Sequence, residues 1–219
     1  MILLNSVLEK TGGDQGDYFI EVATIVQAFE SLVTGPLLGI SSGTQPVLGY
    51  NYGAKNIPLI KKAEKQLTLF ALGFTTVCFG LSFLISRPFS QMFVGFSNSG
   101  GDSASIVDAS VKFIQVYMYG IIPLSFQYVF VDGLTGMGQA KYSIWLSLNR
   151  KLILYIPSLY LLAYLTQDAS SCFYAEMIAD VASGIVTSIF YFIFIPKIFK
   201  KRLNEKCEDD KGDSLRTIS

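Results

Sequence analysis

The chain has 219 residues, of which 51% are hydrophobic and only 16% are charged. Soluble domains carry about 25% charged residues, so this composition, with a mean hydropathy of +0.43, indicates a membrane protein. The 17 basic and 17 acidic side chains cancel, and no basic run or nucleic-acid-binding motif is present, so no nucleic-acid partner is expected. The sequence has no histidine, and its three cysteines form no Cys-x-x-Cys pair. A zinc or haem site is therefore not expected, and no cofactor is predicted.

The N-terminal residues 1–12 are predicted to be the remnant of a helix. Residues 1–8 are apolar but lack the basic start and the small-residue cleavage site of a signal peptide. Residues 9–17 are polar and rich in glycine, which is typical of a loop. The N-terminus is placed outside by the charge pattern described below, so we expect further spans upstream of it.

Five long apolar stretches follow. A helix needs about 20 apolar residues to cross about 30 Å of hydrocarbon, and each stretch reaches or approaches this length. We see no strand pattern, so the predicted fold class is an all-α membrane protein. With their flanking turns, the expected transmembrane helices of the region 13–200 are 16–51, 62–95, 105–138, 141–166 and 170–199.

The basic residues are concentrated in alternate loops between these stretches, and so on one side of the membrane. All Lys and Arg residues except Lys10, Arg87 and Lys112 lie in alternate loops or in the C-terminal tail. Cytoplasmic loops carry an excess of Lys and Arg. The loops near residues 55–65 and 139–143 and the C-terminus are therefore predicted to be cytoplasmic. Residues 201–219 are charged and aperiodic and are expected to be disordered.

Proline and glycine interrupt the first and third spans. Pro36 and Pro46 each remove a backbone donor, so breaks or kinks are expected there. Pro123 lies near the middle of the third span. The glycines at 35, 39 and 43 recur every fourth residue and are expected to let another helix approach closely. The second span is almost pure hydrocarbon and is expected to face lipid.

Several acidic side chains lie within the predicted spans. A charge near the bilayer centre costs about 2.5–3.5 kcal/mol on insertion scales, so such residues need a reason. Glu30 and Asp180 lie closest to the middle of their spans. Asp132 lies nearer the cytoplasmic end, and Glu21 and Glu176 lie nearer the outer end.

Polar residues near these acids recur at helical spacing, which places them on one side of each helix. Such a side is expected to face the bundle interior or a water-filled cavity. The first span carries Thr24, Gln27, Ser31 and Thr34, the fifth carries Glu176, Asp180, Gly184 and Ser188, and the third adds Gln115, Tyr119 and Gln127.

Two hypotheses account for the acids. In the first, the acids are structural and are neutralised by hydrogen bonds or by pairing with Arg150 or Lys112. In the second, the acids bind a proton, a sodium ion or the cationic part of a substrate. Glu30 is the first choice for the functional role and Asp180 the second. Arg150 is predicted either to extend towards the inner interface or to pair with Asp132.

The segment 36–56, PLLGISSGTQPVLGYNYGAKN, goes beyond patterning. It resembles a signature of the multidrug and toxic compound extrusion (MATE) transporters. Residues 138–141 (GQAK) and 148–157 (LNRKLILYIP) resemble other parts of the same family, and the likeness covers about residues 13–200. The signature positions expected to act as motif or hinge residues, together with the proline of the third span, are Pro36, Gln45, Pro46, Gly49, Asn51, Gly53, Ala54 and Pro123.

This resemblance implies the C-terminal six-helix lobe of a transporter, with its first helix truncated and its N-terminal lobe missing. It implies a multi-pass plasma-membrane protein, not an enzyme, that exports organic cations in exchange for sodium ions or protons across the lipid bilayer. Two other functions are considered. One is a lipid-linked oligosaccharide flippase of the same superfamily, although intramembrane bases are almost absent here beyond Arg150 and Lys151. The other is a non-transporting remnant or assembly subunit.

Overall fold

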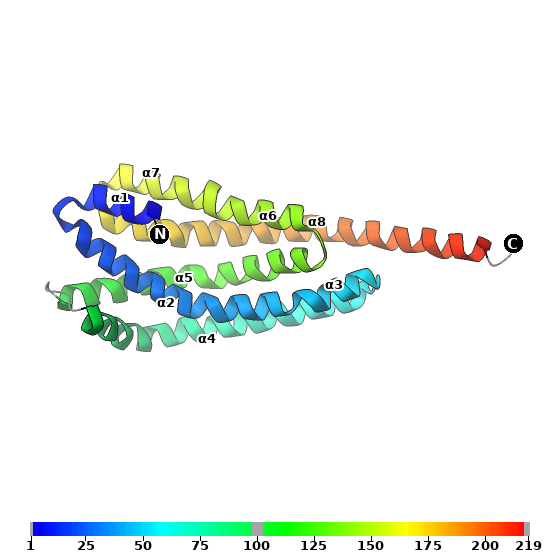
Figure 1. Cartoon of the computed structure of the whole chain (residues 1–219), viewed down its shortest axis with the longest axis horizontal. Helices are drawn as coiled ribbons and strands as arrows, with labels where there is room; N and C mark the ends of the chain where they lie inside the picture. The colour runs from blue at the N-terminus through cyan, green and yellow to red at the C-terminus, as the bar shows by residue number, and fades with distance from the viewer. Residues whose placement is uncertain (1, 98–102, 217–219) are drawn as a thin grey trace.

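The structure, a computed structural model, describes residues 2–97 and 103–216, and these ranges contain helices and turns but no strand (Figure 1). The fold is thus all-α, as predicted. The α-helices are α1 Ile2–Gly12, α2 Gly16–Gly43, α3 Gln45–Gly53, α4 Ile57–Ser97, α5 Ser103–Gly136, α6 Ala140–Leu148, α7 Ile156–Thr166 and α8 Cys172–Arg216. Short 3₁₀ turns, η1 Gly13–Gln15 and η3 Ala169–Ser171, precede α2 and α8, and a π-helical segment, η2 Asn149–Tyr155, joins α6 to α7.

Four of the five predicted spans are helical segments long and apolar enough to cross a membrane. They are Gly16–Gly53, Ile57–Gly95, Ser103–Gly136 and Ala169–Asn204. The remaining expected span, 141–166, is divided into α6, η2 and α7. π-helical turns are rare and occur mostly as short insertions at functional positions, so this segment is notable.

Helix α5 lies at the centre of the bundle. It packs against α8, α4 and α2, while the run from α6 to α7 lies along α8 (Figure 1). The side chains of Met118, Ile121 and Leu124 in its middle are fully buried. The hydrophobic effect does not favour helix association within lipid, so such a bundle depends on close packing and on polar contacts.

The closest helix crossings are made at glycines on α8, α3 and α5. A Cβ atom added to Gly184 would lie 2.5 Å from the carbonyl oxygen of Pro123, so α8 contacts the backbone of α5 directly. A Cβ on Gly49 of α3 would lie 2.8 Å from the carbonyl oxygen of Gly136. A side chain at either glycine would push the helices apart.

No described helix packs against the glycine stripe at 35, 39 and 43, where the sequence predicts a close helix approach. A Cβ atom at any of the three would meet no atom within 4 Å among the described residues. The stripe is on the side of α2 that no other described helix covers, where Leu32 and Leu38 are also exposed. The spacing identified small residues correctly but could not say whether a partner lies opposite.

Only one of the three prolines named above, Pro46, lies beside a helix break; the other two lie inside continuous helices. α2 continues through Pro36, and α5 continues through Pro123. The first span is interrupted at Thr44, and Pro46 lies in the first turn of α3, where a missing N–H does least harm.

Helix α4 exposes much of its length. Leu69, Phe70, Val77 and Leu84 are each more than half exposed, as expected for a helix that faces lipid.

The tail differs from the sequence-based expectation. α8 continues to Arg216, through most of residues 201–219, for which we expected disorder; residues 217–219 lie outside the described ranges. Lys, Glu, Arg and Leu are all good helix formers, so a helix can extend here without an apolar face.

Candidate functional site

The middle of the bundle holds a buried ion pair between Arg150 and Asp180. Arg150 Nε donates to Asp180 Oδ1 at 2.8 Å, and the two side chains are only 8% and 1% exposed. Arg150 also donates to the hydroxyl of Tyr128 on α5 at 3.3 Å. Arg150 therefore neither extends to the interface nor pairs with Asp132. Its partner is Asp180, which agrees with the structural hypothesis that an intramembrane acid pairs with Arg150. The π-helical segment η2 turns this side chain inward towards α8.

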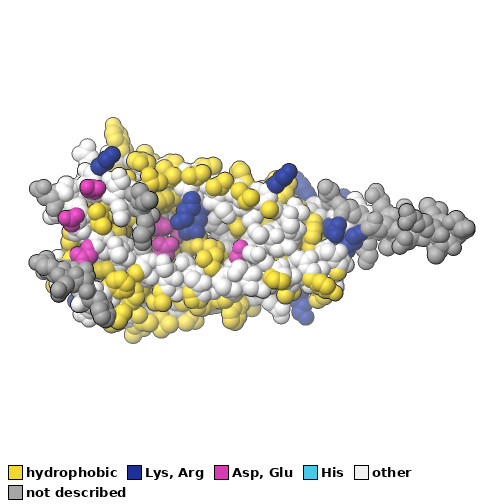
Figure 2. All heavy atoms as spheres, viewed as in Figure 1, with side chains coloured by type: hydrophobic (Ala, Val, Ile, Leu, Met, Phe, Trp, Pro, Cys, Tyr) yellow, Lys and Arg dark blue, Asp and Glu magenta, His cyan; other side chains and the backbone are white. Residues whose placement is uncertain are grey.

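A second, more exposed pair lies next to the first. Lys151 Nζ lies 3.4 Å from Glu176 Oε1, with side-chain exposures of 56% and 17%. These two residues line an open pocket of about 570 Å³ together with Gln27 and Glu30 of α2. Figure 2 shows acidic and basic side chains side by side in the middle of a face that is otherwise largely uncharged.

Glu30 joins these pairs into one cluster. It is partly buried on α2 and lies within electrostatic range of Glu176, Asp180 and Lys151. Glu30 makes no ion pair with any described residue, whereas the other two acids each have a basic partner. We call Glu30, Glu176, Asp180, Arg150 and Lys151 the carboxylate cluster. With all five groups ionised, its three acids and two bases leave one excess negative charge, which favours a cation.

Of the two predicted glutamines, only Gln27 reaches the pocket. Gln27 lines it beside Glu30. Gln127 is buried, and its Oε1 accepts a 2.6 Å hydrogen bond from Ser183 of α8. Gln127 therefore links α5 to α8 in the core and lies outside the pocket.

Asp132 lies apart from the carboxylate cluster. It accepts hydrogen bonds from the Ser41 hydroxyl and from Gln45 Nε2, the latter at 3.0 Å. These contacts tie α5 to the junction between α2 and α3. Gln45 of the signature thus has a structural partner, and Gly49 makes the close crossing with α5 described above.

The end of the signature forms a compact turn held by α8. The Asn51 side chain donates to the Val47 carbonyl at 2.8 Å, and the Ala54 amide donates to the Tyr50 carbonyl at 2.9 Å. Arg202 of α8 donates to the backbone carbonyls of Tyr52, at 3.3 Å, and of Gly53, at 3.5 Å.

Glu64 was missed by the sequence analysis. It lies on α4, is only 6% exposed, and accepts a hydrogen bond from the Tyr191 hydroxyl of α8; its other oxygen, Oε1, has no partner among the described residues. The expected helix 62–95 included Glu64, but its basic neighbours placed it at the cytoplasmic end, away from the acids that were considered buried. A helical signal was present, because Glu64 recurs with the buried apolar positions 57, 60, 67 and 71 of the same helix.

No group of three or more Asp, Glu, Cys or His side chains in the described ranges is arranged to hold a metal ion.

The comparisons with known proteins agree with this architecture. The MatE family profile matches residues 10–161 of the sequence. The chain belongs to the MatE family of transporters. It is therefore a multi-pass membrane protein of a non-enzymatic transporter family. A search of curated proteins finds no match.

Solved MATE structures share the fold. An outward-facing multidrug resistance MATE family transporter of the MOP superfamily matches with a TM-score of 0.80 and 21% identity, over 92% of this chain and 43% of that one. A Vibrio cholerae MATE transporter in the bent form matches with a TM-score of 0.74 and 15% identity, over 92% and 42%. A MOP superfamily transporter from Pyrococcus furiosus, described as having a binding pocket of reverse polarity, matches with a TM-score of 0.79 and 20% identity, over 91% and 43%. This chain thus spans less than half the length of these transporters and matches one lobe of them.

Proposed function

We propose that this chain is the C-terminal lobe of a multidrug efflux antiporter, which exports organic cations in exchange for sodium ions or protons. The observation that carries the proposal is the placement of Glu30 in an open pocket, within a cluster of net negative charge and without a basic partner of its own. An acid of this kind can take a small cation in one state and a cationic substrate in the other.

The members of the cluster have different roles in this proposal. Glu30 is the coupling acid. Glu176 borders the same pocket and adds negative charge, and Gln27 supplies a polar wall. Asp180 and Arg150 hold the π-helical segment and α8 together beneath the pocket. Tyr155, which also lines the pocket, offers an aromatic face to an organic cation.

The proposal includes a second lobe and a place in the cell. The matched transporters are more than twice as long as this chain, so the complete transporter needs a partner lobe that faces the exposed glycine stripe of α2. We place the C-terminus in the cytoplasm of a plasma-membrane protein, on the charge pattern of the loops. The prolines of α2, α3 and α5 are proposed hinge positions.

The test is efflux by the lobe assembled with its N-terminal partner. Glu30→Gln should abolish ethidium efflux driven by a sodium or proton gradient in everted vesicles, while membrane insertion is unchanged. Asp17→Asn is the matched control, because Asp17 is an exposed acid at the start of the same helix. Normal efflux by Glu30→Gln would show that Glu30 is not the coupling acid. Separate sodium and proton gradients identify the coupling ion.

The flippase alternative is not favoured by this geometry. A pyrophosphate site needs unpaired bases, whereas Arg150 and Lys151 each pair with an acid. The remnant alternative and the antiporter proposal predict different results in this assay. A remnant supplied with the partner lobe would transport no drug under any gradient.

A further inference from the structure

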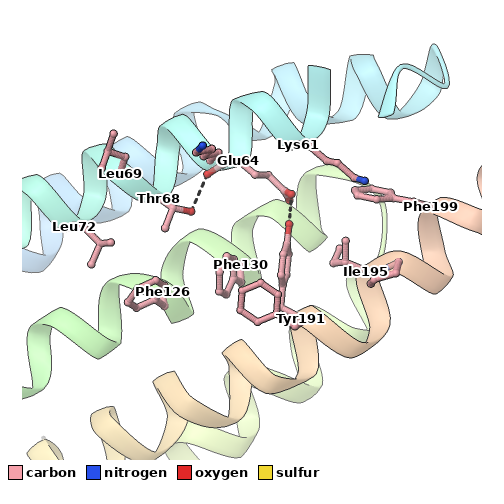
Figure 3. A pocket seen from close by; sticks show the side chains of 13 residues that line it. Lys61, Glu64, Thr68, Leu69, Leu72, Phe126, Phe130, Tyr191, Ile195 and Phe199 are labelled. Carbon is pink, nitrogen blue, oxygen red and sulfur yellow. Dashed lines mark hydrogen bonds between the residues drawn. The ribbon is translucent and has the colours of Figure 1, made fainter. Parts of the chain in front are cut away.

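A groove lies on another side of the bundle, between α4 and α8. Helix α5 packs against both of these helices and forms the floor of the groove (Figure 3). The groove has a volume of about 480 Å³, within the range of small-ligand sites. Its lining is mostly apolar and aromatic, and Phe126, Phe130 and Phe199 project into it. The polar lining residues are Lys61, Glu64, Lys65 and Thr68.

The groove is separate from the carboxylate cluster. Phe126 and Phe130 lie four residues apart and share one face of α5. Tyr128, which contacts Arg150, and Asp132, which contacts Ser41 and Gln45, lie two residues further on. A two-residue offset rotates a side chain by roughly 200° around the helix axis, so the groove opens on the face of α5 opposite both contacts.

The wall formed by α4 faces lipid. Leu69, which lines the groove, is 71% exposed, and Phe192 on the α8 wall is also 71% exposed. An apolar groove that opens beside such residues in a bilayer is accessible to acyl chains.

The polar end of the groove is basic. Lys61 and Lys65 lie one turn apart on α4, both exposed and both lining the groove. The Lys61 ammonium lies 5.8 Å from the centre of the Phe199 ring, so it lies over an aromatic ring of the α8 wall. The carboxylate between them, Glu64, is turned inward to the Tyr191 hydroxyl and to Gly133 of α5 (Figure 3). The two lysines therefore present positive charge at the mouth, and this charge opposes entry of an organic cation.

We propose that this groove binds an anionic phospholipid, with an acyl chain along the aromatic floor and the phosphate at Lys61 and Lys65. Charge complementarity selects the headgroup, and the apolar walls accept the chain. The site depends on α4, α5 and α8 only, so it does not depend on what the transporter exports.

The test uses an indole placed in the groove and lipids that quench its fluorescence. The chain has a single tryptophan, Trp145, which Trp145→Phe removes. Phe126→Trp in that background reports from the floor of the groove, and Leu72→Trp reports from the α4 wall if the first variant fails to fold. Each protein is reconstituted in phosphatidylcholine vesicles with rising fractions of brominated phosphatidylglycerol or brominated phosphatidylcholine.

Each lysine near an anionic headgroup should contribute about fivefold to binding. We expect quenching to show at least a tenfold preference for phosphatidylglycerol over phosphatidylcholine. This preference should weaken at high salt and be lost in the double variant Lys61→Ala, Lys65→Ala. Lys141→Ala, an exposed lysine on α6, is the matched control and should leave the preference unchanged. Equal quenching by the two lipids, or a preference that survives loss of both lysines, would overturn the proposal. Absence of quenching by either lipid would also overturn it and would indicate that protein or a drug-like cation occupies the groove.

Discussion

Arg150 and Asp180 form an ion pair in the interior of the bundle, with Nε and Oδ1 2.8 Å apart and both side chains almost fully buried. Arg150 comes from the π-helical segment η2 and Asp180 from α8. The pair therefore holds the interrupted run α6–η2–α7 against the continuous helix α8. The neighbouring pair of Lys151 and Glu176 joins the same two elements at the surface of the pocket. The two pairs have the same chemistry but very different burial, and this difference can be tested.

Breaking the buried pair should cost far more stability than breaking the exposed one. Asp180→Ala leaves the Arg150 guanidinium buried without a counter-charge, and such changes typically cost about 3–5 kcal/mol. Glu176→Ala removes one member of a partly exposed pair and should cost less than about 1 kcal/mol. The measurement is the free energy of unfolding of the purified chain in phospholipid–detergent micelles, followed by circular dichroism.

Replacing both members of the buried pair supplies the control. Arg150→Met combined with Asp180→Leu removes both charges and should recover most of the stability lost in Asp180→Ala. Equal losses for Asp180→Ala and Glu176→Ala would show that the pair is not buried as described.

The crossing of α5 and α8 should be intolerant of any side chain at Gly184. A Cβ there would lie 2.5 Å from the Pro123 carbonyl oxygen, so Gly184→Ala must separate the two helices. Overpacking of this kind costs about 1–3 kcal/mol. Gly39→Ala is the matched control: its Cβ meets open space, and alanine favours a helix by about 0.5–1 kcal/mol over glycine. Thermal unfolding of the chain should therefore shift down for Gly184→Ala and stay level or rise for Gly39→Ala, and the reverse order would contradict the crossing.

The sequence predicted the elements better than their contacts. Apolar run lengths gave the helical class and four long helices close to their observed bounds. The stripe through Glu176, Asp180 and Gly184 did face the bundle interior, because residues four apart share a helix face. The sequence predicted that Arg150 could pair with an intramembrane acid but not that this acid is Asp180, since the π-helical segment changes the rotation of the helix by an amount that no spacing rule reveals.

Glu64 shows a different limit of sequence reasoning. Its lysine neighbours placed Glu64 at the cytoplasmic edge of the expected helix 62–95, while the structure begins α4 at Ile57 and buries Glu64. The apolar positions around Glu64 were visible at helical spacing, but the charge count outweighed them. The glycine stripe of α2 shows a related limit, because a pattern of small residues does not reveal whether the helix opposite belongs to this chain.

The contact between Glu64 and Tyr191 should stabilise the packing of α4 and α8 around α5. The Tyr191 hydroxyl donates to Glu64 Oε2, and both residues are buried. Hydrogen bonds to charged groups contribute about 1.5–3 kcal/mol. A double-mutant cycle of Glu64→Leu and Tyr191→Phe, measured by unfolding in micelles, should give a coupling energy in that range. Thr68→Val is the control, because the Thr68 hydroxyl donates within α4, to the Glu64 backbone carbonyl. Additive effects of the two substitutions would show that the side chains do not interact.

The charge pattern of the loops makes a prediction about sidedness. In a background with the cysteines at 78, 172 and 207 replaced by serine, single cysteines can be placed at exposed positions at the two ends of the bundle. Lys62→Cys and Lys200→Cys should react with a membrane-impermeant maleimide in everted vesicles but not in intact cells, because Lys-rich loops stay in the cytoplasm. Thr166→Cys, at the end of α7, should show the opposite pattern. Labelling of Lys62→Cys and Thr166→Cys from the same side would contradict the assignment of the span 141–166, while labelling of all three with inverted sidedness would reverse the orientation and place the C-terminus outside.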